Sequence, residues 1–231
     1  MRILALETST EYCSVALWQD GKLSGRCEMA GQKHSEMLIE MLDAVLQESG
    51  FRIQDMDAIA YGSGPGSFTG VRIACGAAQG LALGAGLPVA GVCTLQALAE
   101  ASGKPRVIAA LDARMGEIYV AAYERAGDGW VAVCEPLLCK PEHAPKLPGD
   151  GWFGAGSGFA AFAALQDSYA GQLSGVDASA IPEARAIASS AAVMLAQGGG
   201  LDAAQAQPFY LRDKVAFKTV ERELMAAEKS R

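Results

Sequence analysis

The order of elements expected in the first hundred residues constrains the fold more than any other feature of this sequence. The Asp20-Gly21 dipeptide between two apolar runs is a strong hairpin signal. Apolar runs and their periodicity predict strands over 2–6, 12–18, 22–29, 57–61 and 88–92, and helices over 35–48, 68–85 and 95–101. Three antiparallel strands therefore precede alternating helices and strands.

A shortened repeat of this opening begins near residue 106. The stretch RVIAALDARMGEIYVAAY, 106–123, has the pattern of strand, turn and strand, and 130–135 is the third strand. The remainder is rich in Ala and Gly, with helices predicted over 159–165 and 183–197.

Strand–strand–strand–helix–strand–helix is the order of a ribonuclease-H-like lobe, the unit that actin, hexokinase and Hsp70 carry twice. We therefore predict an α/β, actin/Hsp70/hexokinase-like fold of two lobes, the second shortened. The expected parts are a first lobe over 1–104, a second over 105–218 from whose end residues can return to the first, and a charged tail over 219–231. PGDGW, 148–152, and QGGG, 197–200, are expected to be loops.

The charge is acidic and unevenly distributed. The 231 residues are 51% hydrophobic and carry a net charge of −7. Residues 212–231 have a net charge of +2, which leaves −9 for the rest. Because attraction to phosphate dominates nucleic-acid binding, the body is a poor nucleic-acid binder on its own. The basic tail leaves a minor contact open.

Cysteine and histidine usage argues for a reduced, metal-free protein. The six cysteines form no C-x-x-C pair, and only two histidines are present. No signal peptide is visible, so we expect a cytoplasmic protein with no metal and no cofactor. The uncharged stretch 73–92 contains five glycines and Pro88, which argues against a membrane span.

The stretch GSGPGSFTGVRI, 62–73, raises the question of a phosphate loop. A Walker loop needs a lysine, but none lies between Lys33 and Lys104. The G-x-G-x-x-G spacing also fails, and Pro65 removes a backbone donor. The alternative is a tight turn that begins a helix.

That turn is assigned to Gly64, Pro65, Gly66 and Ser67. Ser67 or Thr69 can cap free N–H groups at the start of the helix.

Three further places could carry chemistry. In actin-like kinases the first hairpin turn holds phosphate, and here Thr8, Ser9 and Thr10 occupy it, although hydroxyl residues are also ordinary in turns. Asp112 beside Arg114 is either a turn-stabilising pair or a catalytic acid, and the first is favoured. His34, just before a helix, is expected to be exposed or capping, since no ligand partner lies four residues on.

Small residues recur every four positions on the second predicted helix. They are Gly76, Gly80 and Gly84, and also Gly70, Ala74, Ala78 and Ala82. On the first predicted helix the apolar arc spans roughly 220°, about twice what one core requires. Either both helices are buried within this chain, or part of their surface contacts a partner.

Five motifs together resemble the bacterial TsaB (YeaZ) family. They are LALETSTEYCSVAL, AYGSGPGSFTGVRI, AQGLALG, LDARMGEIYVA and YLRDKVA, and the resemblance extends to about residue 218. It implies a non-catalytic relative of TsaD. With TsaD and the ATPase TsaE, such a protein supports transfer of threonylcarbamoyl to the adenosine 3′ of the anticodon in tRNAs that read codons beginning with A.

The departures from the catalytic relative support a partner role. TsaD holds a metal with two histidines, and the matching positions here are Thr94 and Leu98. Neither supplies an imidazole, so no catalytic residue is expected. The alternative is a small actin-like ATP-binding hydrolase or kinase that uses Thr8–Thr10 and Asp112.

The resemblance also implies the partners. TsaD is expected as a heterodimer partner through the first two helices, TsaE joins that pair, and a homodimer is possible for the free chain. Contact with tRNA is expected mainly through the complex, and none with a membrane. The predicted partner surface consists of Met37, Leu38, Met41, Leu42, Val45, Val71, Ala74, Cys75 and Ala78.

Overall fold

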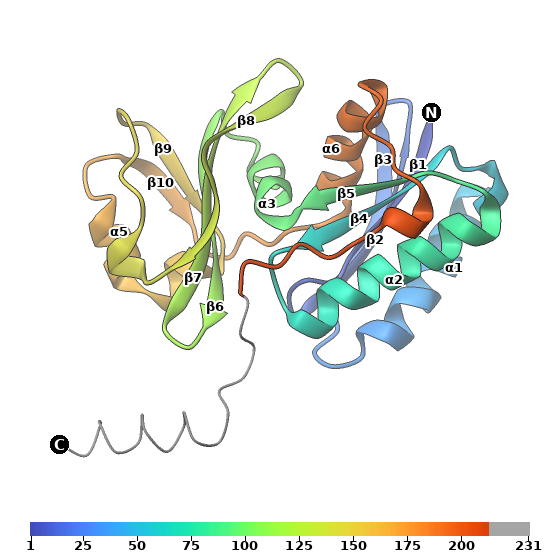
Figure 1. Ribbon diagram of the computed structural model, residues 1–231, viewed down its shortest axis with the longest axis horizontal. Coiled ribbons are helices and arrows are strands. Elements are labelled where there is room, and N and C mark those ends of the chain that lie inside the picture. The colour runs from blue at the N-terminus through green and yellow to red at the C-terminus, as the bar shows by residue number, and fades with distance from the viewer. Residues whose placement is uncertain (213–231) are drawn as a thin grey trace.

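Two five-stranded sheets, one in each lobe, organise the computed structural model, which describes residues 1–212 (Figure 1). The elements of the first lobe are β1 (Arg2–Glu7), β2 (Tyr12–Gln19), β3 (Lys22–Met29), α1 (His34–Ser49), β4 (Ala58–Gly64), α2 (Phe68–Ala85), β5 (Val89–Cys93) and α3 (Thr94–Ser102). The sheet has the order β3-β2-β1-β4-β5, with β1, β4 and β5 parallel and β2 and β3 antiparallel. The predicted ribonuclease-H-like order is confirmed.

Helices cover both faces of the first sheet. On one face, α1 and α2 pack against Leu4, Leu6 and Val15. On the other face, α6 (Ala184–Ala196) packs against Ile3 and Ala5 in a layer built mostly of alanines. Small side chains on both surfaces let helix and sheet approach closely.

The second lobe repeats the three-stranded opening and then shortens. Its elements are β6 (Arg106–Arg114), β7 (Glu117–Ala126), β8 (Gly129–Cys139), β9 (Trp152–Ala155), α4 (Ser157–Ala161), α5 (Ala163–Ser168) and β10 (Leu173–Asp177). The sheet order is β10-β9-β6-β7-β8. Two features differ from the sequence prediction: β9 and β10 were not expected, and the helix predicted over 159–165 is interrupted at Phe162, where α4 ends.

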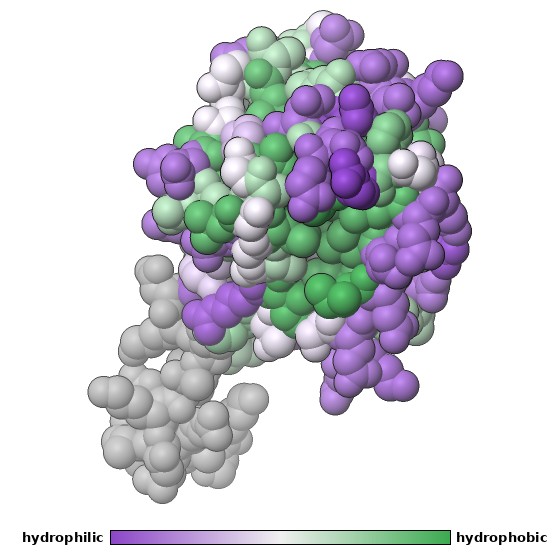
Figure 2. Space-filling view, turned by 90° about the vertical axis from the view of Figure 1, so that its right-hand side faces the viewer, coloured by the Kyte–Doolittle hydropathy of each residue, from purple (hydrophilic) through white to green (hydrophobic). Residues whose placement is uncertain are grey.

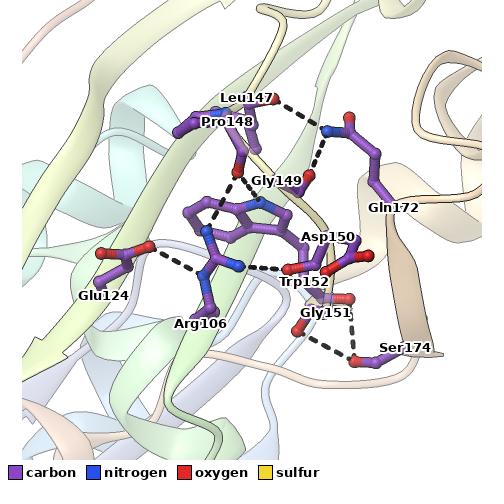
Figure 3. Close-up of polar contacts among 10 residues, drawn as sticks. All are labelled: Arg106, Glu124, Leu147, Pro148, Gly149, Asp150, Gly151, Trp152, Gln172 and Ser174. Atoms are coloured by element: carbon purple, nitrogen blue, oxygen red, sulfur yellow. Dashed lines mark hydrogen bonds and ion pairs between the residues drawn. The ribbon is translucent and has the colours of Figure 1, made fainter.

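The loop before β9 is held by side chains rather than by a strand. Arg106 stacks on Trp152, with 4.4 Å from its Cζ to the ring centroid (Figure 3). Its guanidinium donates to the carbonyls of Pro148 and Asp150 and pairs with Glu124 at 2.8 Å. The predicted loop 148–152 thus ends in a strand that begins at Trp152.

Helix α3 lies between the two lobes (Figure 1). Leu95 and Leu98 belong to the core of the second sheet, whereas Ala97 packs in the alanine-rich layer of the first. One short helix therefore joins both cores.

The chain returns to the first lobe after β10. Helix α6 and residues 203–206 pack on the first lobe, inside the range 105–218 assigned above to the second. The predicted tail 219–231, and 213–218 before it, lie outside the described residues. None of the helices in the described part combines the length and apolar character needed to cross a membrane. All six cysteines are free.

Candidate functional site

The glycine loop packs directly onto the β1–β2 turn. A Cβ on Gly62 would lie 1.7 Å from Glu7 Oε2, one on Gly66 would lie 2.6 Å from the Ser9 carbonyl oxygen, and one on Gly70 would lie 1.9 Å from the Thr8 carbonyl oxygen. No Cβ tolerates such distances. The glycines are therefore needed for close approach between two loops.

Most polar groups of that turn are bonded inside the protein. The Thr8 hydroxyl donates to the Gly70 carbonyl at 2.7 Å, and the Ser67 amide donates to the Ser9 carbonyl at 2.7 Å. The Ser9 amide donates to Glu7 Oε1, and Thr10 accepts from the Tyr12 amide. The Ser9 hydroxyl has no hydrogen-bond partner, but a phosphate bound to the Thr8 hydroxyl or the Ser9 amide would have to displace these bonds.

Glu7 is a buried carboxyl beneath the glycine loop. It is 1% exposed, its Oε2 has no hydrogen-bond partner, and burial raises its pKa to about 7. It does not line the cleft between the lobes. A carboxylate that positions a metal must reach the ligand, which this one does not.

A cleft of about 740 Å³ lies between the lobes. Ser9, Thr10, the glycine loop and Phe68 at the start of α2 line it on one side, and the β6–β7 turn lines it on the other. Residues 209–212 form part of its wall. Sequence reasoning did not place that segment at a site, although residues 210–212 begin the YLRDKVA motif and Phe209-Tyr210-Leu211 is an apolar run.

The β6–β7 turn uses Asp112 for its own geometry. Asp112 accepts from the Arg114 amide at 2.8 Å and pairs with the Arg114 guanidinium at 3.2 Å. Arg114 and Met115 both have positive φ, 63° and 57°, so the turn needs this support. The turn-stabilising role favoured for Asp112 is confirmed.

The other residues considered as site candidates from the sequence are buried or serve the helix start. His34 begins α1, is 8% exposed rather than solvent-facing, and donates from Nε2 to the Thr10 carbonyl at 2.8 Å. Thr94 and Leu98 are fully buried. Within residues 1–212 no three His, Cys, Asp or Glu side chains gather as a metal site would require. Ser67 caps α2 as predicted, accepting from the Gly70 amide, and the turn before it contains Gly64, Pro65 and Gly66.

The structure corrects the choice of side chains for the partner surface. Met37 is partly exposed, but the other eight side chains lie in the core at 6% exposure or less: Leu38, Met41, Leu42, Val45, Val71, Ala74, Cys75 and Ala78. They face the first sheet, so they cannot contact a partner in the folded chain. Periodicity located the apolar arc but did not show which side of it the sheet covers.

The opposite side of these helices is open. A Cβ on Gly76, Gly80 or Gly84 would meet no atom within 4 Å, and Leu83 and Ile39 are each 60% exposed. Figure 2 shows an apolar band, edged by hydrophilic side chains, on the side of the molecule where α1 and α2 lie in Figure 1. We call Ile39, Gly76, Gly80, Leu83 and Gly84 the open face.

Known proteins match nearly the whole chain. The family model for TsaD, tRNA N6-adenosine threonylcarbamoyltransferase, matches residues 27–219. The tRNA threonylcarbamoyladenosine biosynthesis protein TsaB of Escherichia coli (strain K12) is 42% identical, with 94% of this chain and 97% of that protein covered. The protein of the same name from Haemophilus influenzae is 38% identical, with 94% and 96% covered.

Solved structures agree with this match. The structure described as YeaZ from Pseudomonas aeruginosa is 39% identical with a TM-score of 0.82, and covers 91% of this chain and 99% of its own. A second structure, described as an uncharacterized protein with similarity to peptidase YeaZ from the same organism, has a TM-score of 0.84 and the same identity and coverage. The sequence identity and the matching fold together show that this chain belongs to the TsaB (YeaZ) family.

Proposed function

We propose that this chain serves threonylcarbamoyladenosine synthesis on tRNA as a non-catalytic subunit. It pairs with TsaD, and the pair recruits TsaE. Its contact with tRNA is made mainly through that complex, in the cytoplasm. The names of the relatives support the pathway, and the arrangement of the β1–β2 turn supports the non-catalytic role.

The observation that carries the pairing is the open face. Each glycine inside a helix costs roughly 1 kcal/mol relative to alanine. The Cβ positions of Gly76, Gly80 and Gly84 have space around them, so no contact within residues 1–212 requires glycine there. A ridge without side chains lets a second helix approach closely. We therefore move the proposed TsaD surface from the buried stripe to the open face of the same two helices.

Binding to purified TsaD tests this proposal. Gly80→Leu fills the ridge and Leu83→Glu places a charge beside it, and both positions are exposed, so the chain stays folded. We expect both variants to lose TsaD binding by calorimetry and pull-down. Val131→Glu, at a 56% exposed position on β8, is the matched control and keeps native affinity. Native TsaD affinity in both ridge variants would contradict the proposed surface.

Two assays address the remaining parts. Sedimentation of the free chain shows whether it forms a homodimer, and Gly80→Leu abolishes that dimer if the same face makes it. An ATPase assay of the purified chain tests the alternative actin-like hydrolase. Metal-dependent turnover that disappears in Asp112→Asn would overturn the non-catalytic role.

A further inference from the structure

Residues 207–212 run from the end of β4 across to the second lobe, and we call them the strap. At the start, the Gln207 amide donates to the Tyr61 hydroxyl at 3.0 Å, and that hydroxyl donates back to the Gln207 carbonyl. The Phe209 amide donates to the Ser63 carbonyl at 2.7 Å. Gly64 has φ of 109°, and a Cβ there would lie 2.6 Å from the Phe209 carbonyl oxygen. The strap therefore lies flush against the glycine loop.

The next residue of the strap holds the first turn of α2. The Tyr210 hydroxyl accepts from Arg72 Nε at 2.6 Å. The Arg72 guanidinium lies 3.6 Å from the centroid of the Phe68 ring, and the Phe68 and Tyr210 rings are 5.7 Å apart. Stacking and hydrogen bonding thus fix Tyr210 to the helix start.

The end of the strap holds the second lobe. Arg212 Nη2 pairs with Glu117 Oε2 at 2.6 Å, at the first residue of β7. The side chains of Arg212 and Glu117 are 16% and 33% exposed, so solvent only partly screens the pair. Leu211 packs against the core that the second sheet shares with α3.

We propose that the strap couples the angle between the lobes to the first turn of α2. Tyr210 and Arg212 are two residues apart, so the chain between these anchors spans at most roughly 7 Å. A movement of β7 away from the first lobe must therefore break the Arg212 pair or pull on Tyr210 and Phe68. The coupling is reciprocal: whatever orders the first turn of α2 also favours one lobe angle.

Hydrogen exchange on the full chain tests this coupling. Glu117→Gln removes the charge from the far anchor and leaves the strap sequence intact. We expect the hydrogen-bonded amides of Phe209 in the strap and Val71 in the first turn of α2 to exchange on the order of fivefold faster, because the ion pair no longer stabilises the strap. Charge reversal at both positions, Glu117→Arg with Arg212→Glu, restores slow exchange.

Glu124→Gln is the matched control. Glu124 lies on the same strand and pairs with Arg106 at 2.8 Å, but this pair stays within the second lobe. We expect the Glu124→Gln variant to leave hydrogen exchange in the strap and in α2 unchanged. Exchange that rises only around the β6–β7 turn in Glu117→Gln, or equally in both variants, would overturn the coupling.

The effect on a partner rests on the proposed function and has its own readout. If TsaD binds the open face, Glu117→Gln weakens TsaD binding severalfold because the helix start is less ordered. Unchanged TsaD affinity beside faster exchange in α2 would refute the link from strap to partner. Whether the open face binds TsaD is tested separately. Native TsaD affinity of the Leu83→Glu variant would show that it does not.

Discussion

Two stripes of small residues run along α2 with the same spacing and opposite surroundings. Ala74, Ala78 and Ala82 are 0% exposed and pack against the first sheet. Gly76, Gly80 and Gly84 meet nothing within 4 Å of a built Cβ. A repeat of small residues every four positions therefore permits close approach to the helix, but it does not show whether, or on which side, another element approaches.

The residue type distinguishes the two stripes. Alanine fills the sheet-facing stripe because a methyl group fits there and favours the helix. Glycine on the other stripe leaves the free helix less stable, and nothing in residues 1–212 offsets that loss. Substitutions on the two stripes should therefore have opposite consequences.

The largest expected effect comes from a charge on the buried stripe. Ala78→Glu places an unpaired carboxylate in the core, which costs on the order of 5 kcal/mol, so the variant unfolds or aggregates. Gly80→Glu, two residues on, stays folded with a melting temperature near that of the parent chain. Thermal unfolding followed by circular dichroism compares the two. A folded Ala78→Glu variant would show that the stripe is not core.

The next effect concerns the glycine that begins the same helix. Gly70→Ala puts a methyl group 1.9 Å from the Thr8 carbonyl oxygen, so the loop and the hairpin turn must separate. We expect a loss of about 3 kcal/mol in the free energy of unfolding, typical of overpacking against backbone. Urea titration measures it, with Gly76→Ala as the control on the open side. Equal stability of the two variants would contradict the contact.

Protonation of Glu7 gives a smaller, pH-dependent effect below the same loop. The folded chain holds a proton that the unfolded chain releases between pH 4.5 and about 7, so stability falls as pH rises through that window. Glu7→Gln has no charge to bury and is more stable than the parent at pH 8 by on the order of 2 kcal/mol. The advantage disappears toward pH 4.5. Urea titrations across this range test it, and a gain independent of pH would exclude the titration of Glu7 as its cause.

The smallest expected effect is a gain in stability from a substitution on the glycine stripe. Gly80→Ala adds a methyl group in open space and should stabilise the free chain by about 1 kcal/mol. Differential scanning calorimetry of the chain without partner measures it. Destabilisation instead would mean that the ridge already has a contact within the free protein.

The first lobe was predictable because its signals are local. The Asp20-Gly21 turn has φ of 47° and 88°, the left-handed geometry that its residues favour, and α2 spans the predicted 68–85. The second half depends on distant contacts. Strand β9 begins at Trp152, where Arg106, far back in the sequence, holds the preceding loop, and no local pattern encodes that pairing.

The candidate site, too, was predictable from the sequence only in its local features. Residue types alone indicated that the glycine loop was no Walker loop and that Ser67 would cap α2. They did not reveal that the glycines contact Glu7, Ser9 and Thr8, because those contacts join segments more than fifty residues apart. For the same reason the buried and open sides of α1 and α2 needed the three-dimensional structure.

The return of α6 to the first lobe has a consequence for how the protein is made. Ile3, Ala5 and Ala60 lie on the sheet face that α6 covers, yet α6 is synthesised only after the whole second sheet. While the ribosome is still translating the second lobe, that apolar face is exposed to water and open to non-native contacts. The nascent chain therefore closes its first lobe only once residue 196 has left the exit tunnel, and the two lobes mature together rather than one after the other.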